Sequence, residues 1–353
     1  MIFIILLIVI IGLYFILNKT SLKKYNKNNL MFCVLIFIIF TVIQGCRANN
    51  VGTDTSKYVN IYNIIKNLPW SSVILKEDFN LEIGFGLLMK ILSSINLSAR
   101  FFLIVVAMII NGALSYFVYK NSKNPLLSII IFMGAEFFTL SFTALRQMLA
   151  VVIILNAYTF IKESKFKQAV FLIILASMFH TTALVFLPVV LFKKISVNKK
   201  FLIIFVTLLI LVQILGFPIL EYILGNTYYG RYLNNGTIGE GIVQLLVIIV
   251  YTTLGLIIYY KCDKKPEYNT LILIMLTAIL IQSLTWKIQL LGRAMWYFYI
   301  FNMIYLPNLI NEIKGIKQKN ILNVVVGGLS VAQYVLFSMD MYNVMPYYFL
   351  KGD

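Results

Sequence analysis

Ten stretches of this sequence are apolar over roughly the 20 residues that an α-helix needs to cross a bilayer. Backbone inside a bilayer has no water to bond with, so such stretches predict helices whose hydrogen bonds are internal. They cover residues 1–17, 30–46, 98–119, 125–141, 143–161, 201–218, 239–260, 269–285, 294–310 and 321–338. Together with the segment 168–192, they predict an all-α polytopic integral membrane protein of about 10 to 12 transmembrane helices.

The composition excludes a soluble globular domain, because 61% of the residues are hydrophobic and 12% are charged. The net charge of +17 lies mostly on lysines in short loops between the apolar stretches, which is the pattern that orients membrane proteins. We therefore exclude nucleic acid as a partner.

Cys33, Cys46 and Cys262 fall in or beside different predicted helices and indicate no disulfide framework. Residues 1–353 contain no linker, so a single transmembrane domain is expected.

The lysines also predict the orientation of the chain. The basic residues follow the first apolar stretch, which is typical of a signal-anchor helix with its N-terminus outside. The lysine-bearing loops 18–29, 120–124 and 161–167 are then cytoplasmic. The outer loops, which we expect to form the face with the functional site, are 47–97, 219–238 and 286–293.

The segment 168–192 has two interpretations. A single crossing would put the lysines of 193–200 outside and break the charge rule for every later loop. A re-entrant hairpin that breaks around His180 would instead leave 193–200, 261–268 and 311–320 all cytoplasmic. We favour the hairpin, and a single crossing with a weak charge bias is the alternative. Irregular backbone at membrane depth needs a cover of protein or a cavity, so the hairpin would place His180 in a cavity.

Arg146 and His180 each interrupt a long apolar stretch, and His180 is the only histidine of the chain. An ionisable side chain at that depth costs at least ~2.5 kcal/mol, so it usually marks a functional site. Gln147 adds a second polar group beside Arg146. The structural alternatives are that Arg146 snorkels to the surface from the first turn of its helix and that His180 hydrogen-bonds across helices with Thr181 or Thr182.

The outer loop 47–97 is too long for a simple connector, and its apolar residues recur at helical spacing. It therefore predicts two amphipathic helices at the membrane interface. The recurring residues are Tyr58, Ile61, Tyr62 and Ile65, then Phe85, Leu88, Met89 and Leu92. Asp54 precedes the first helix and Glu82 begins the second, where a carboxylate can cap a helix or balance its dipole. Capping is the structural alternative to a functional role for both.

The arginines indicate an anionic ligand. Arg47, Arg231 and Arg293 fall in the outer loops, whereas the cytoplasmic loops carry essentially lysine only. A guanidinium binds phosphate or carboxylate through two parallel hydrogen bonds, while lysine suffices for orientation. We therefore expect an anionic substrate at the outer leaflet. Arg47 and Arg231 have an equally good explanation as solvated loop charges.

Four motifs in order resemble the EpsG-type exopolysaccharide polymerases, which are similar in role to the Wzy polymerases of O-antigen and capsule assembly. The resemblance covers about 47–190, and beyond it only the helix count and Gly292-Arg293 match. Four motifs in one order are more specific than any single one. They are G-x-D (Gly52, Asp54) followed by Tyr58, E-x-G-F (Glu82, Gly84, Phe85), L-R-Q-x-L-A (Leu145, Arg146, Gln147, Leu149, Ala150) and A-S-x-F-H-x-T-A-L (Ala176, Ser177, Phe179, His180, Thr182, Ala183, Leu184).

The resemblance implies a bacterial GT-C-like glycosyltransferase in the cytoplasmic (inner) membrane, with its active site facing outside. It would join oligosaccharide repeat units carried on undecaprenyl pyrophosphate, beside a flippase and a chain-length regulator of the same pathway. Arg146 and Arg293 would neutralise charge on the departing pyrophosphate. His180, Glu82 or Asp54 would accept the proton of the acceptor hydroxyl. The other expected substrate contacts are Gln147, Arg47, Arg231 and Tyr58.

Two other functions are considered. A flippase or transporter should show internal repeats or paired broken helices, and the sequence predicts a single break. A membrane acyltransferase that modifies the polysaccharide commonly has a carboxylate near its histidine, and none lies near His180 in sequence. The sequence also lacks a D-x-D pair and metal-ligand spacing, so we predict catalysis without a metal ion or other cofactor.

Overall fold

The protein, in a computed structural model, is described over residues 2–19, 25–75, 81–226, 238–263, 265–285 and 291–349. Within these residues it is helical, and the only strand-like pairing is an isolated bridge between Arg47 and Phe349. The helices are α1 (Ile2–Asn18), α2 (Tyr25–Gly45), α3 (Thr55–Ile65), α4 (Trp70–Leu75), α5 (Ile83–Ile95), α6 (Ala99–Asn121), α7 (Pro125–Gly134), α8 (Phe137–Thr143), α9 (Leu145–Lys162), α10 (Phe166–Ser177), η2 (Thr181–Phe186), α11 (Val189–Phe192), α12 (Lys199–Leu224), α13 (Ile238–Lys261), η4 (Pro266–Tyr268), α14 (Asn269–Gln282), α15 (Leu291–Tyr299), α16 (Asn302–Asn311), α17 (Ile316–Gln333), η5 (Tyr334–Ser338) and η6 (Met341–Asn343). The predicted all-α fold is confirmed.

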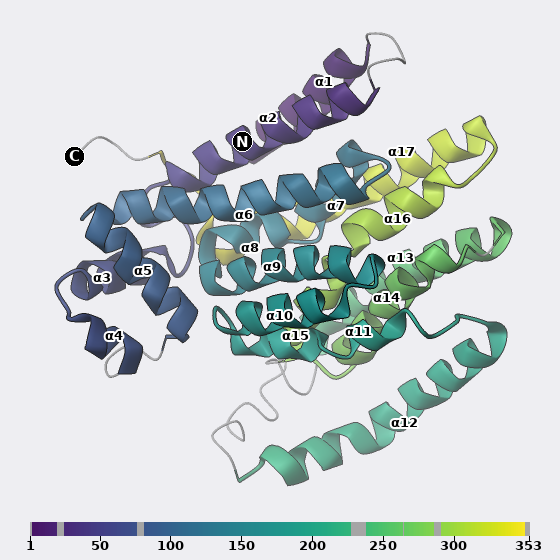
Figure 1. The fold of residues 1–353 in the computed structure, drawn as a ribbon. Coiled ribbons are helices and arrows are strands. Elements are labelled where there is room, and N and C mark those ends of the chain that lie inside the picture. Colours follow the sequence, from purple (N-terminus) through teal and green to yellow (C-terminus); the bar gives the residue numbers. More distant parts are fainter. Residues whose placement is uncertain are drawn as a thin grey trace.

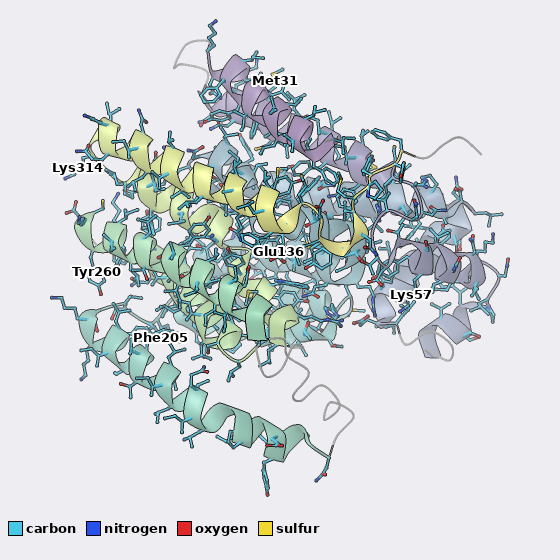
Figure 2. All side chains as sticks on the ribbon, turned by 180° about the vertical axis from the view of Figure 1, so that it is seen from behind. Met31, Lys57, Glu136, Phe205, Tyr260 and Lys314 are labelled. Atoms are coloured by element: carbon cyan, nitrogen blue, oxygen red, sulfur yellow. The ribbon has the colours of Figure 1, made fainter. Side chains whose placement is uncertain are left out.

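Each of the ten predicted apolar stretches is helical, but two of them are broken. The stretch 125–141 is divided into α7 and α8, which are bent by 59°. Glu136 lies at this break with a left-handed φ of 71°, inside the bundle (Figure 2). The stretch 294–310 is divided between α15 and α16. Among the described residues, six helices are long and apolar enough to span a membrane, or seven if the bent pair is one span. This is fewer than predicted because the other apolar helices are shorter.

The segment 168–192 folds as the predicted hairpin. α10 ends at Ser177, His180 has extended backbone, and η2 and α11 lead back. The ammonium of Lys193 donates a hydrogen bond of 2.7 Å to the carbonyl oxygen of Lys162. The end of the segment therefore lies beside its start, which a single crossing would not allow.

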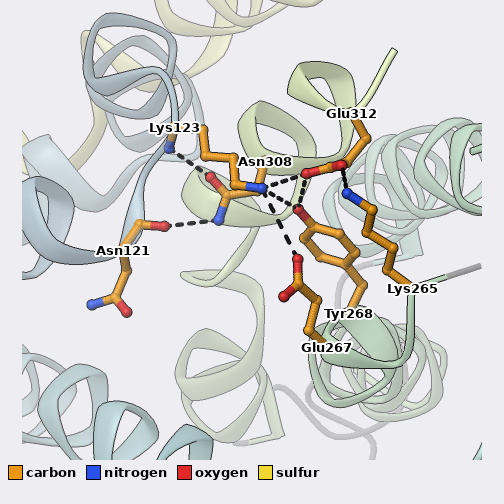
Figure 3. Close-up of polar contacts among 7 residues, drawn as sticks. All are labelled: Asn121, Lys123, Lys265, Glu267, Tyr268, Asn308 and Glu312. Carbon is orange, nitrogen blue, oxygen red and sulfur yellow. Dashed lines mark hydrogen bonds and ion pairs between the residues drawn. The ribbon is translucent and has the colours of Figure 1, made fainter. Parts of the chain in front are cut away.

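The basic loops meet at one end of the bundle. The backbone N–H of Lys123, after α6, donates to Asn308 on α16 at 2.7 Å. The ammonium of Lys123 reaches Tyr268 and Glu312, and Lys265 also pairs with Glu312 (Figure 3). Asn121 donates to Thr159 in the last turn of α9 at 3.4 Å, next to the loop that Lys193 contacts. We call the loops 120–124, 161–167, 193–198, 261–268 and 311–315 the lysine-rich end.

The other end of the bundle carries the helices of the loop 47–97. In Figure 1, α3, α4 and α5 form a group at the end away from the lysine-rich loops, and α12 lies to one side of the bundle. α3 and α5 are amphipathic as predicted, and their recurring residues are buried or partly buried. Lys90 of α5 joins the two helices, because its ammonium donates to the carbonyl oxygens of Ile65, Lys66 and Leu68.

The orientation of the two ends can be tested by cysteine labelling. In a variant without Cys33, Cys46 and Cys262, Ser56→Cys should react with a membrane-impermeant thiol reagent on intact cells. Ser196→Cys, which is also exposed, should react only after the cells are permeabilised. Labelling of Ser196→Cys from outside would contradict the assignment of the lysine-rich end to the cytoplasm.

Candidate active site

Glu82 joins Arg146 and His180 into one cluster. Its Oε2 atom lies 2.6 Å from Nη1 of Arg146, and its Oε1 atom lies 2.8 Å from Nδ1 of His180. The three residues come from the start of α5, the first turn of α9 and the turn of the hairpin. Their side chains are 12%, 26% and 10% exposed, so the cluster is largely shielded from solvent. The structure thus brings together three of the four predicted catalytic residues.

Gly84 allows this approach. Its N–H donates to the carbonyl oxygen of Met178 in the hairpin turn at 2.8 Å. A Cβ atom at Gly84 would lie 2.7 Å from that oxygen, which is closer than real Cβ atoms come. The E-x-G spacing therefore has a physical reason, because the glycine lets the start of α5 touch the turn that carries His180.

Gly84→Ala is expected to lower turnover by roughly 10–100-fold, because displacing the turn by about 1 Å misplaces His180 relative to Glu82. The measurement is the rate of product formation by purified protein. Gly112→Ala in α6 is the matched control, since its Cβ would make an ordinary contact of 3.6 Å with Phe37. Full activity of Gly84→Ala would show that the close approach is not needed.

The carboxyl of Glu82 is ionised. Burial alone would raise its pKa, but the hydrogen bond with His180 and the charge of Arg146 outweigh burial and lower the pKa to about 2. An ionised carboxylate only accepts hydrogen bonds, so Nδ1 of His180 carries a proton. In the uncharged imidazole the lone pair is then on Nε2. Within the described residues, no hydrogen bond occupies Nε2.

Tyr58 lies on the other side of Arg146. Its side chain is buried on α3, close enough to the guanidinium for the two groups to affect each other's pKa. Burial raises the pKa of the Tyr58 phenol, although Arg146 acts against this rise. The phenol is therefore uncharged, and Arg146 is held between an ionised carboxylate and a neutral hydroxyl.

Asp54 and Glu82 both occupy N-cap positions, before α3 and α5 respectively, but neither side chain caps its helix. The capping interpretation is therefore wrong for both. Asp54 is close enough to Tyr58 for its charge to act on the phenol. Its carboxylate has no hydrogen-bond partner within the described part of the chain, so it remains available to a ligand.

The turn before Asp54 needs glycine. Gly52 has a φ of 92°, and a Cβ atom there would lie 2.9 Å from the carbonyl oxygen of Phe142. The N–H of Asp54 donates to Oγ1 of Thr143 at 3.1 Å. The G-x-D motif therefore packs on the end of α8, directly before the turn of α9 that carries Arg146.

α15 closes the cluster. The side-chain amide of Gln147 donates to the backbone carbonyl of Arg293 at 2.7 Å, so Gln147 holds the start of α15 against α9. The Arg293 side chain is exposed and, in the described residues, has no ion-pair partner. Tyr297, one turn later, is fully buried and accepts a hydrogen bond of 3.4 Å from Thr182. The sequence did not indicate Tyr297, because it lies in an aromatic run that is also typical of interface anchors.

Arg47 does not join the cluster. It is 1% exposed, and its guanidinium donates to the carbonyl oxygens of Gln44, Val51 and Phe142. Its charge is thus held by the protein itself, and it is not the solvated loop charge considered from the sequence. Arg231 lies outside the described residues.

No group of three or more histidine, cysteine, aspartate or glutamate side chains that could hold a metal ion occurs in the described ranges. The absence of a metal from the chemistry stays a prediction. The cluster itself holds an imidazole, a guanidinium and a carboxylate, and the elements beside it carry the exposed guanidinium of Arg293 and the carboxylate of Asp54.

The fold and the cluster define a polytopic all-α membrane protein with an ionised carboxylate between an arginine and a histidine. α9 runs from this cluster to the lysine-rich end, so the two lie at opposite ends of one helix. The sequence profile of the EpsG family matches residues 30–349, and the chain belongs to that family. No curated protein and no solved structure matches the chain.

Proposed function

We propose that this protein joins lipid-linked oligosaccharide repeat units into a polysaccharide at the outer face of the cytoplasmic membrane. Membership of the EpsG family indicates a polymerase type of role. The observation that carries the finer proposal is the contact of Glu82 with both Arg146 and His180. A guanidinium and an imidazole thus lie on one carboxylate, and this supports the proposal because transfer from a lipid pyrophosphate needs a phosphate-binding group beside a base.

In the proposed step, Nε2 of His180 accepts the proton of a hydroxyl on the acceptor sugar. The oxygen of that hydroxyl forms the new bond to the anomeric carbon of the donor sugar. The bond from this carbon to the pyrophosphate breaks, and the electron pair leaves with the undecaprenyl pyrophosphate. Glu82 stabilises the imidazolium that forms, by the logic of a carboxylate–histidine pair.

Three features would neutralise the leaving group. Arg146 and Arg293 supply positive charge, and Arg293 has no carboxylate partner in the described residues. The third feature is the start of α9, where no side chain caps the helix and the first turn has no acidic residue. Free N–H groups at such a helix start bind phosphate oxygens.

The experiment that tests the proposal uses purified protein and labelled lipid-linked repeat units. Products longer than one repeat unit would support the polymerase. Exchange of intact substrate between leaflets without elongation would indicate a flippase, and a mass increase of one acyl group would indicate an acyltransferase. Either result would replace the proposed reaction.

Arg146→Lys tests the phosphate role. We expect it to lose nearly as much elongation rate as Arg146→Ala, because a lysine ammonium cannot bond Glu82, Tyr58 and a phosphate with the geometry of a guanidinium. The measurement is the initial rate at saturating substrate. Full activity of the lysine variant would mean that Arg146 only orients its helix.

A further inference from the structure

Two adjoining pockets open at the lysine-rich end, far from the candidate active site. They hold about 350 and 760 Å³ of space, part of it open to solvent, and share Lys123 and Asn311 in their linings. None of the described residues that line them is acidic. We call them together the asparagine pocket, which is formed chiefly by Asn26, Asn29, Asn124, Asn311, Asn323 and Lys319.

Among the described residues that line the pocket, one cation is without a partner. The ammonium of Lys123 is directed at Glu312 and Tyr268 (Figure 3). That of Lys319 has neither an ion pair nor a hydrogen bond with any described residue. Lys319 can therefore neutralise about one negative charge, and no carboxylate among the described lining residues competes with a ligand for it.

The pocket also has unused amide groups. Asn29 is 7% exposed, and its Oδ1 atom is buried without a hydrogen-bond partner. A buried amide oxygen without a partner is costly, so rotation of the Asn29 amide towards the pocket that it lines, where a ligand can bond the oxygen, would be favoured. Asn124 and Asn323 are bonded to each other at 3.4 Å, and the Asn311 side chain makes no hydrogen bond among the described residues. Such groups recognise hydroxyls as well as phosphate oxygens.

The helices that line the pocket also carry exposed apolar side chains. Phe15 and Ile16 of α1 and Val324 of α17 are 64%, 69% and 74% exposed. Met31 of α2 is 51% exposed, and Figure 2 shows it on the outer side of that helix. α2 and α17 are both long and apolar enough to span a membrane. The pocket thus lies at the ends of spanning helices, where lipid headgroups meet acyl chains.

We propose that the asparagine pocket binds the headgroup of an anionic phospholipid that carries one phosphate and free hydroxyls, as phosphatidylglycerol does. The phosphate would pair with Lys319, and the hydroxyls would bond the amides of Asn29 and Asn311. A zwitterionic headgroup would fit less well, because its ammonium would meet no carboxylate. This inference does not depend on the proposed function, since the two sites lie at opposite ends of the bundle.

The test is native mass spectrometry of delipidated protein titrated with phosphatidylglycerol or with phosphatidylcholine of the same chains. The wild type should bind phosphatidylglycerol more tightly. Lys319→Gln combined with Asn311→Leu should weaken that binding by about tenfold or more, the loss expected for one charge-assisted hydrogen bond. Lys167→Gln, which removes an exposed charge at the same end, is the matched control and should bind as the wild type does.

Equal affinity for the two lipids, or equal binding by wild type and double variant, would overturn the proposal. Soluble glycerol phosphate that binds as tightly as phosphatidylglycerol would identify a soluble phosphate ester as the ligand and would also overturn the proposal.

The unfolding midpoint of each lipid-free variant checks its fold. Lys319→Gln alone changes a partly exposed side chain, so it keeps the test valid if the double variant is unstable. Arg293→Ala should keep lipid binding even if elongation is lost.

Discussion

His180→Ala is expected to lower the rate of chain elongation by roughly 10²–10⁴-fold, the range for loss of a general base. Binding of the lipid-linked substrate should change little, because the loss falls on the transition state. The physical reason is that Glu82 holds the proton on Nδ1 and leaves Nε2 open to a substrate. The measurement compares elongation rates with substrate binding determined separately.

His180→Gln separates basicity from hydrogen bonding. A glutamine can keep one hydrogen bond to Glu82 but cannot accept the proton, so this variant should be nearly as slow as the alanine variant. If it elongates normally, His180 is a structural hydrogen-bonder. The base would then be Asp54, because its carboxylate has no hydrogen-bond partner among the described residues, whereas that of Glu82 is still paired with Arg146. If both variants stop binding substrate, His180 contacts the pyrophosphate.

Glu82→Gln is expected to lower turnover about as much as His180→Ala does. The loss should reach up to ~10⁴-fold, as when an amide replaces the carboxylate of other carboxylate–histidine pairs. Glutamine keeps the shape of the side chain, but it no longer requires a proton on Nδ1 of His180 and leaves Arg146 without its ion pair. Glu82 acts through His180 and is a positioning residue. A Glu82→Gln variant with wild-type turnover would exclude this role.

The pH dependence of stability provides a readout that does not depend on activity. The pKa of Glu82 is about 2 in the folded protein, below its usual value of about 4.3. Because the folded pKa is lowered, the carboxylate stabilises the fold above a pH of about 4.3, and this contribution is lost as the pH falls towards 2. The difference in unfolding midpoint between wild type and Glu82→Gln should therefore shrink as the pH falls over this range. A difference that does not change with pH would contradict the ionised pairing.

The sequence determined the helical segments, the two ends of the bundle and the turn at His180. These features depend on local properties: the length of an apolar stretch, the spacing of apolar residues and the position of lysines. It also identified Arg146 and His180, because ionisable side chains within apolar stretches are costly and so indicate a functional site. The breaks within 125–141 and 294–310 were missed, because a lone glycine, Gly134, inside an apolar stretch does not distinguish a broken helix from a continuous one, and residues 300 and 301 include no proline or glycine.

Only the tertiary structure decided which of these polar residues meet. Glu82 precedes Arg146 by 64 residues and His180 by 98, and contact over such separations depends on how the helices pack. At the N-cap of α5 the sequence allows Glu82 to bond its own helix, but the close contact of Gly84 with Met178 brings it to His180 instead. Packing likewise directed the guanidinium of Arg47 to backbone carbonyls and left that of Arg293 exposed. Residue type sets what a side chain can bind, and the packing of distant segments sets what lies within its reach.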